Sequence, residues 1–581
     1  MIRKLLASVR EYKRPSVLSF LFIVGEVVIE CLIPFITADL VNRLKGDINM
    51  KSLLLTGALL IFMAVVSLAC GGLAGYTSAR ASAGFAKNLR HDVFDKVQSF
   101  SFENIDRFSS SSLVTRLTTD IANVQMSYMM VIRAAVRSPL MFIFSVIMAY
   151  IMGGALATAF IVVIPVLAVG LYIIAKKAMP AFHSVFKKYD NLNRSVEENV
   201  RAMRVVKGFA REEYEKKKFG DAAEDIRRDF TRAERIVALN HPLMQICLYF
   251  NMLFVLTVGA KIIITSRGST IDVGQMSAML TYGFQILMSL MMLSMIFVIL
   301  TISLESMRRI SEVLSEEPTM SNPDTPVMEI RDGSIAFKDV SFKYSRESEN
   351  FALSDVNLRI ESGMTVGILG GTGSSKSTLV QLIPRLYDAT EGSVLVGGVD
   401  VRQYDLNALR DSVAMVLQKN QLFSGTIREN LRWGNENATD EELVEACRLA
   451  QADEFIRSFP DGYDTYIEQG GTNVSGGQKQ RLCIARALLK KPKILILDDS
   501  TSAVDTKTDA LIREGFRKYI PETTKLIIAQ RVASVQDADM IILMDNGRIT
   551  ASGTHEELMQ SAPIYREIYE EQTNGRAEDE Q

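Results

Sequence analysis

The 581-residue sequence predicts a multi-domain membrane protein, in which an all-α domain of six transmembrane helices precedes an α/β domain built on a phosphate-binding loop. Two observations predict this architecture. Apolar stretches near the ~20 residues needed to cross a bilayer recur through the first half of the chain. In the second half, an apolar strand runs directly into GGTGSSKST, and another apolar strand ends in two adjacent aspartates. The two halves are therefore expected to fold in different solvents.

The first half contains six candidate spans, which alternate with short and long connections. The spans cover 16–41, 52–78, 138–154, 156–176, 240–265 and 275–304. Three connections are short, whereas 79–137 and 176–240 are long and rich in Lys and Arg. The positive-inside rule places the long connections and the N-terminus in the cytoplasm. The start, MIRKLLASVREYKRP, predicts either an amphipathic helix on the membrane surface or a charged lead-in to the first span.

The long connections have few Gly and Pro and keep apolar residues at three- and four-residue spacings, which predicts helices. The spanning helices are therefore expected to continue into the cytoplasm, with turns near 106–114 and 208–216. A soluble domain that docks on these turns would be linked mechanically to the membrane. The alternative is a pair of solvated helical hairpins without a partner.

Composition limits the other functional classes. Lys and Arg number 65 against 67 for Asp and Glu, so a net charge of −2 gives no reason to expect a nucleic-acid partner. The five cysteines stand apart and form no Cys/His cluster. We interpret them as packing residues rather than as zinc ligands or a disulfide framework.

Ionisable residues within a span need a partner or a function. Glu26 and Glu30 lie four apart in the first span and therefore share one helix face. They either line a path for a cationic substrate or pair with Arg or Lys of a neighbouring helix. Several methionines in the last span suit an adaptable binding surface, but they also suit contact with lipid, which we favour. They are Met276, Met279, Met288, Met291, Met292 and Met295.

Composition also sets the predicted domain boundaries. The transmembrane domain is expected over 1–314, and a polar stretch with two prolines over 315–334 is expected to form a linker. The nucleotide domain is expected over 335–572. The acidic tail, 573–581, is expected to be disordered.

The segment from Gly370 to Thr378 predicts a phosphate-binding loop between a strand and a helix. In such a loop, backbone N–H groups and the helix N-terminus hold the phosphates, while Lys376 reaches the β- and γ-phosphates. Ser377 and Asp498, at the end of the strand KILILD, are expected to hold Mg²⁺. Ser375 stands where the usual pattern has glycine, so binding should survive only if the backbone angle there suits serine. The predicted nucleotide contacts are Gly370, Gly371, Thr372, Gly373, Ser374, Ser375, Lys376, Ser377 and Thr378.

A second phosphate site is predicted where NVSGGQ precedes an amphipathic helix. Its residues are Ser475, Gly476, Gly477 and Gln478. Small residues, free N–H groups and a helix dipole are again combined there. Because one nucleotide does not need two such sites, the second is expected to serve a nucleotide bound to another chain.

These motifs closely resemble the nucleotide-binding domain of ATP-binding cassette (ABC) transporters. GGTGSSKST resembles Walker A, ILILD Walker B and VSGGQ the family signature. The resemblance implies that Tyr344 stacks on adenine, that Gln418 contacts Mg²⁺, and that STSAVD, ending in Asp505, is the D-loop. LFSGTIRENL is typical of the exporter branch. The segments 108–125 and 205–215 resemble the two coupling-helix regions of exporters.

The resemblance implies a half-transporter that works as a dimer with a second half-transporter. It implies ATP and Mg²⁺ as cofactors, a lipid bilayer as surroundings and a small hydrophobic compound as substrate. Each ATP would lie between Walker A of one chain and the signature of the other. The expected location is the plasma membrane of a bacterium, with the nucleotide domain in the cytoplasm.

Two departures from the family pattern predict unequal sites. The family has glutamate after the Walker B aspartate and histidine in the switch loop, where this chain has Asp499 and Gln530. Asp499 retreats by about 1 Å, and Gln530 cannot carry a proton's charge. The chain thus resembles the degenerate-site subunit of a heterodimeric bacterial multidrug exporter. The alternatives are a homodimeric lipid or peptide exporter with slow ATPase activity, and an ATP-gated channel or regulatory subunit.

Overall fold

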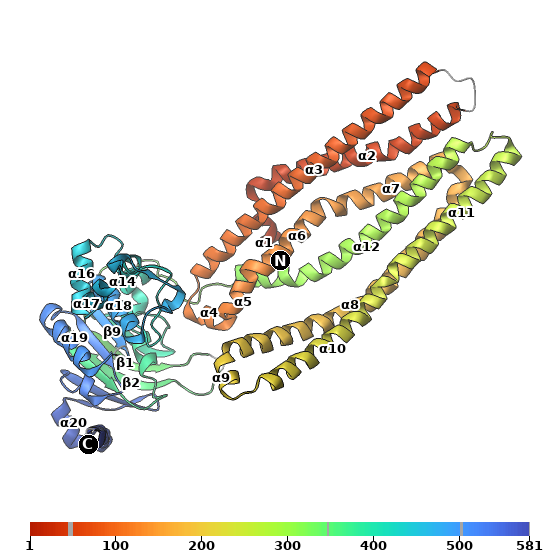
Figure 1. Ribbon diagram of the computed structural model, residues 1–581. Coiled ribbons are helices and arrows are strands. Elements are labelled where there is room, and N and C mark those ends of the chain that lie inside the picture. Colours follow the sequence, from red (N-terminus) through yellow and green to blue (C-terminus); the bar gives the residue numbers. More distant parts are fainter. Residues whose placement is uncertain (45–49, 346–347, 500–503, 580–581) are drawn as a thin grey trace. The chain divides into compact units, whose positions relative to one another are not determined.

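The computed structural model describes residues 1–44, 50–345, 348–499 and 504–579. They form two compact units, which we describe one at a time (Figure 1). The helical unit comprises 1–98 and 109–316, and the nucleotide unit comprises 99–108 and 317–581.

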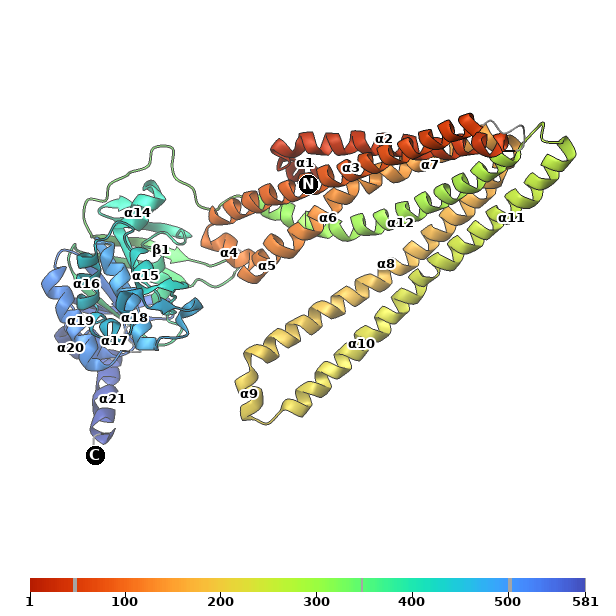
Figure 2. The same cartoon turned by 45° about the horizontal axis from the view of Figure 1, so that its top comes forward.

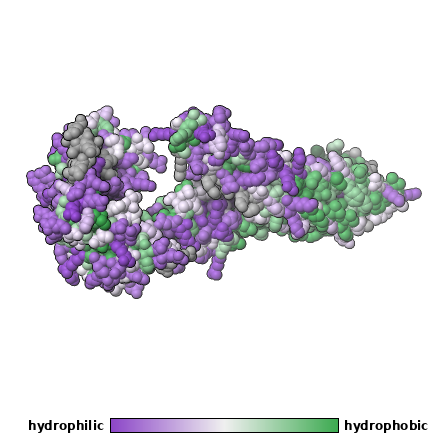
Figure 3. Space-filling model, turned by 90° about the horizontal axis from the view of Figure 1, so that it is seen from below, coloured by the Kyte–Doolittle hydropathy of each residue, from purple (hydrophilic) through white to green (hydrophobic). Residues whose placement is uncertain are grey.

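Among its described residues, the helical unit contains six helices or helix series that are long and apolar enough to cross a membrane. Four of the predicted spans lie within them, and the other two, 138–154 and 156–176, extend one and two residues into η3 (Gly154–Ala157). The elements that contain the spans are α2 (Lys13–Arg43), α3 (Met50–Gln98), α7 (Ala134–Gly153), α8 (Thr158–Arg201), α11 (Asn240–Ser266) and α12 (Val273–Ser315). Figure 3 shows apolar surface gathered toward the end where α11 and α12 meet, as expected for a lipid-facing region.

Several of these helices continue beyond their apolar parts, as the sequence predicts. The second long connection forms the end of α8, a short α9 (Met203–Gly208) and α10 (Glu212–Ala238). Figures 1 and 2 both show α8 and α10 side by side. The first connection resumes as α5 (Ser110–Thr115), η2 (Arg116–Asp120) and α6 (Ile121–Ile132), which lead into α7.

The N-terminal segment packs on the bundle rather than standing free. It comprises α1 (Ile2–Ala7) and η1 (Arg10–Tyr12). Leu5 is buried, and both Ser8 and Arg10 bind Asp92 of α3. Hydrogen bonds to Asp92 therefore hold the charged N-terminal segment against α3 of the helical unit.

Residues 99–108 group with the nucleotide unit. They pack with the nucleotide unit through α4 (Phe102–Phe108). Asn104 is buried, donates to the carbonyl oxygen of Glu317 and accepts from the backbone of Thr319. Composition could not reveal this attachment, because it depends on individual polar contacts between segments distant in the sequence.

The nucleotide unit contains two main sheets. A six-stranded sheet has the order β12-β11-β3-β10-β9-β6, in which only β12 is antiparallel to its neighbour. A four-stranded antiparallel sheet has the order β2-β1-β4-β5. Their strands are β1 (Ile335–Phe342), β2 (Leu353–Ile360), β3 (Thr365–Leu369), β4 (Glu391–Val396), β5 (Val399–Asp400), β6 (Val413–Val416), β9 (Ile494–Asp498), β10 (Thr524–Ile528), β11 (Met540–Asp545) and β12 (Arg548–Gly553).

The parallel strands are apolar throughout because both of their faces are buried. On β9, Ile494 and Ile496 face a core shared with the four-stranded sheet, while Leu495 and Leu497 face a core covered by helices. The helices with positions in these cores include α13 (Lys376–Gln381), α16 (Asp440–Leu449), α18 (Gly476–Leu489), α19 (Thr506–Tyr519) and α21 (Pro563–Asp579). The sheet thus presents the carboxyl ends of β3 and β9 at one edge, where ligands bind in such folds.

The C-terminal helix is α21 (Pro563–Asp579). It includes residues 573–579 of the acidic tail. α20 (His555–Ser561) precedes it.

Candidate nucleotide-binding site

The loop between β3 and α13 has the geometry of a phosphate cradle. Gly370 has φ +154°, and a Cβ there would lie 2.2 Å from the carbonyl oxygen of Met544, so only glycine fits. By contrast, a Cβ on Gly371 or Gly373 would meet nothing within 4 Å. The outer side of the loop is therefore open to a ligand. The Lys376 ammonium donates to the carbonyl oxygens of Gly370 and Gly371 at 2.8 and 2.7 Å, which keeps it over the loop.

Ser375 adopts the left-handed conformation that explains why glycine is usual at this position. Its φ and ψ are 69° and 26°. A left-handed conformation costs a non-glycine residue about 1–2 kcal/mol, but the chain still presents its N–H group at the start of α13. The phosphate loop therefore keeps its geometry with serine in place of glycine, but the strained backbone at Ser375 lowers the free energy of unfolding.

Ser375→Gly should therefore leave the fold intact and raise the free energy of unfolding by up to about 1 kcal/mol. The gain is limited because glycine also increases the entropy of the unfolded chain. Thermal unfolding of the purified full chain measures the change, with Ser374→Gly as the neighbouring control. A loss of stability would show that the serine side chain contributes contacts worth more than the backbone strain.

The Mg²⁺ ligands predicted from the sequence come together at the carboxyl end of β9. The Ser377 hydroxyl donates to Asp498 Oδ1 at 2.9 Å. Burial raises the pKa of Asp498, and the neighbouring charge of Asp499 adds to this, while burial lowers the pKa of Lys376. Two buried carboxylates beside a hydroxyl supply the oxygen ligands that a hard divalent cation prefers. The residues therefore fit Mg²⁺, with Ser377 and Asp498 as the groups that would hold it.

Asp499 and Gln530, the two departures from the family pattern, contact each other directly. Gln530 Nε2 donates to Asp499 Oδ2 at 2.7 Å, and Gln418 Nε2 lies 3.4 Å from the same oxygen. Asp499 itself has φ +48° and is buried. Its carbonyl oxygen accepts from Gln480 Nε2 at 3.3 Å. Three glutamines from separate segments therefore position one aspartate, and Gln480 was missed because no motif marks it.

Tyr344 lies beside the phosphate loop, where the resemblance places the adenine contact. Its hydroxyl lies 2.9 Å from Thr378 Oγ1, and its ring is half-exposed and packs edge-on against Phe342 and Tyr387. Tyr387 in turn donates to Asp106 of α4 at 2.8 Å. Burial raises the pKa of Tyr387, and the hydrogen bond to Asp106 adds to this. The packed rings of Tyr344 and Tyr387 therefore connect the predicted adenine contact to α4. No motif in the sequence marks Tyr387, although it follows the phosphate-loop helix.

The signature residues form the start of α18, away from the contacts of the phosphate loop. Ser475 caps the helix: its hydroxyl accepts from Gln478 N, and Gln478 Oε1 accepts from Ser475 N. Gly476 and Gly477 form the first turn and leave the N-terminus uncrowded. Asp505 caps α19 through Thr508, and the preceding residues 500–503 of the predicted D-loop lie outside the described residues.

In the helical unit, Glu26 and Glu30 meet an arginine. Arg137 of α7 lies 3.4 Å from Glu26 and 2.7 Å from Glu30, measured between side-chain N and O atoms. Of the two interpretations left open by the sequence, this geometry supports an internal ion pair.

The fold and the site together define a membrane-spanning protein with a P-loop nucleotide-binding domain. Two family models match its two parts: ABC transporter transmembrane region over residues 16–304, and ABC transporter over residues 353–502. The chain belongs to the ABC transporter family. The family implies ATP binding and an ATPase coupled to transport across the membrane in which the spans lie.

Relatives and a solved structure are similar to this chain over nearly its full length. YfiB of Bacillus subtilis (strain 168), an uncharacterised ABC transporter ATP-binding protein, is 36% identical over 573 residues, which is 98% of each chain. An uncharacterised ABC transporter ATP-binding protein of Mycobacterium tuberculosis (strain CDC 1551 / Oshkosh) is 34% identical over 96% of each. The fold matches that of a bacterial Atm1-family ABC exporter with ATP bound, with a TM-score of 0.84 and 23% identity, over 97% of this chain and 98% of the other.

Proposed function

We propose that this chain is one subunit of an ATP-driven exporter of hydrophobic or amphiphilic compounds, a multidrug exporter in the plasma membrane of a bacterium. Its own Walker site binds ATP and Mg²⁺ and hydrolyses ATP slowly. Its signature residues complete a second, faster site on a different half-transporter. The N-terminus and the nucleotide domain lie in the cytoplasm, as the basic long connections suggest.

The observation that carries the proposal of a slow site is the bond from Gln530 to Asp499. A general base must accept a proton from the attacking water, so its free lone pairs must point at that water. In this chain, Asp499 Oδ2 accepts from Gln530 at 2.7 Å and also lies within reach of Gln418. The carboxylate is thus engaged by amides, and its side chain is one methylene shorter than glutamate. Lys376, Ser377 and Asp498 remain, which supports binding without fast hydrolysis.

A partner chain is supported by two separate surfaces. Within the nucleotide unit, a groove of about 360 Å³ is lined by apolar side chains that include Leu417, Phe423 and Trp433. The rings of Phe423 and Trp433 stack with their centroids 4.1 Å apart, and Trp433 is 65% exposed. Within the helical unit, the α9 region exposes Val205 and Phe209. In related exporters the second coupling region docks on the partner's nucleotide domain, and these apolar groups suit such an exchange.

Purification of the chain alone tests the proposal of unequal sites. In lipid nanodiscs, the isolated chain should bind ATP but hydrolyse it about a hundredfold more slowly than its complex with a half-transporter that has Glu and His at the matching positions. Steady-state phosphate release measures this difference. Fast turnover by the chain alone would instead support a homodimer with two equivalent sites.

A further inference from the structure

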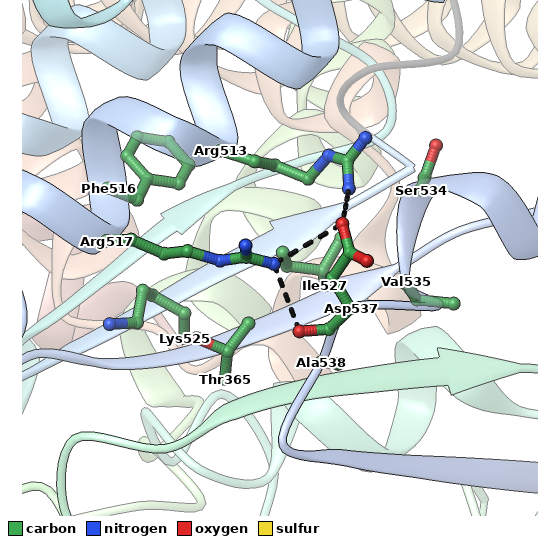
Figure 4. Close-up of a pocket in the computed structure, with 10 residues that line it drawn as sticks. All are labelled: Thr365, Arg513, Phe516, Arg517, Lys525, Ile527, Ser534, Val535, Asp537 and Ala538. Atoms are coloured by element: carbon green, nitrogen blue, oxygen red, sulfur yellow. Dashed lines mark hydrogen bonds and ion pairs between the residues drawn. The ribbon is translucent and has the colours of Figure 1, made fainter. Parts of the chain in front are cut away.

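The switch loop, residues 529–532, carries Gln530 between two fixed segments. β10 leads into the loop, and η7 (Val532–Ser534) leads out of it. From the end of η7 onward, the chain is attached to α19. Ser534 Oγ donates to Asp509 at 3.1 Å, and Asp537 pairs with Arg513 and Arg517 at 3.6 and 3.4 Å. Figure 4 shows both arginines directed at Asp537.

The loop itself is bridged by one side chain of the C-terminal helix α21. Gln572 Oε1 accepts from Val532 N at 2.8 Å, and Gln572 Nε2 donates to the carbonyl oxygen of Gln530 at 3.0 Å. A single primary amide thus pairs with main-chain groups on both sides of Arg531. These two bonds act on the backbone of the residue whose side chain binds Asp499.

α21 is anchored well enough to hold this amide in place. Tyr565 is fully buried, and its hydroxyl lies 2.6 Å from His555 Nδ1. Tyr569 packs on the same core, which also contains Val532. Tyr565, Tyr569 and Gln572 are spaced four and three apart, so they share one face of the helix. The buried tyrosines therefore direct Gln572 at the switch loop, although Gln572 itself lies at the surface.

We propose that Gln572 is a positioning residue of the nucleotide site. By holding the main chain at residues 530 and 532, it directs the Gln530 side chain toward Asp499 and toward the terminal phosphate of ATP. Without it, the freed N–H and C=O groups would bind water, and the loop would sample other orientations. The proposal rests on the ATP site proposed above, because Lys376 and Asp498 place the phosphates beside Asp499.

The test compares ATP with ADP in the full chain, in nanodiscs with Mg²⁺. ADP serves as the internal reference because it lacks the phosphate nearest to Gln530. For Gln572→Ala, the affinity for ATP should fall about three- to tenfold, as expected for lost hydrogen bonds, while that for ADP changes by less than about twofold. Gln572→Glu keeps the acceptor for Val532 N–H and loses the donor, so it should show an intermediate loss of ATP affinity. Glu571→Ala, at the exposed neighbouring position, is the matched control.

The outcomes separate this proposal from the proposed function. If the unmodified chain binds neither nucleotide, the proposed ATP site is wrong, and this inference is wrong with it. If the chain binds both and Gln572→Ala changes neither affinity, only the role of Gln572 is overturned. Equal losses for ATP and ADP would also overturn it, because they would indicate general loosening of the domain. Thermal unfolding of each variant should match that of Glu571→Ala.

Discussion

Replacing Asp499 by Glu and Gln530 by His together should raise ATP hydrolysis at this chain's own Walker site by about a hundredfold. The longer carboxylate would reach a water positioned beyond β9, and the imidazole would supply a group that can carry positive charge as charge develops on the phosphate. Single-turnover hydrolysis in the assembled dimer measures the change, with the partner's Walker lysine replaced so that only this site reports.

The two substitutions should not act additively. In the structure, Gln530 Nε2 lies 2.7 Å from Asp499 Oδ2, so each side chain helps to orient the other. Residues in direct contact commonly couple in double-mutant cycles. Asp499→Glu alone keeps a glutamine that binds the new carboxylate, and Gln530→His alone keeps a base that is too short. Each single variant should therefore recover only a small part of the gain.

A matched control tests whether the restored hydrolysis takes place at this chain's own Walker site. Adding Lys376→Ala to the double variant removes the cation that reaches the β- and γ-phosphates, and the gain should disappear. A double variant that binds ATP normally but stays slow would contradict the view that these two positions limit hydrolysis. In that case the partner's signature, which completes this site, would be the remaining cause.

The sequence predicted those features that depend on residues adjacent to one another in the chain. The phosphate loop, the apolar strand that ends in Asp498 and the six spans are local patterns, and all three are present in the structure. The contact between Asp499 and Gln530 joins residues 31 apart, and the bond from Gln572 to Gln530 joins residues 42 apart. Neither bond has a local signature, because both depend on how β9, β10 and α21 pack. The packing of residues 99–108 with the nucleotide unit likewise depends on contacts between distant segments, such as those of Asn104 with Glu317 and Thr319.

Gly477→Asp should nearly abolish ATP turnover by the assembled heterodimer, by about a hundredfold, without changing ATP binding at this chain's own Walker site. Gly477 lies in the first turn of α18, whose N-terminus is the proposed contact for the partner's nucleotide. A carboxylate there would stand against the phosphate, and like charges brought together cost several kcal/mol. Ser475 and Gln478 would still cap the helix, so the fold should persist.

Because the chain's Walker motif and its signature serve two unequal nucleotide sites, comparing Gly477→Asp with Lys376→Ala distinguishes a heterodimer from a homodimer. Lys376→Ala removes ATP from the slow site, so the dimer should keep most of its turnover, whereas Gly477→Asp acts on the fast site and should remove most of it. In a homodimer, both substitutions fall in both equivalent sites and should be equally damaging. Steady-state ATPase of the two variants, compared at equal amounts of assembled dimer, therefore separates the assemblies. Equal losses would exclude the unequal sites proposed here, because the two motifs would then serve sites of the same kind.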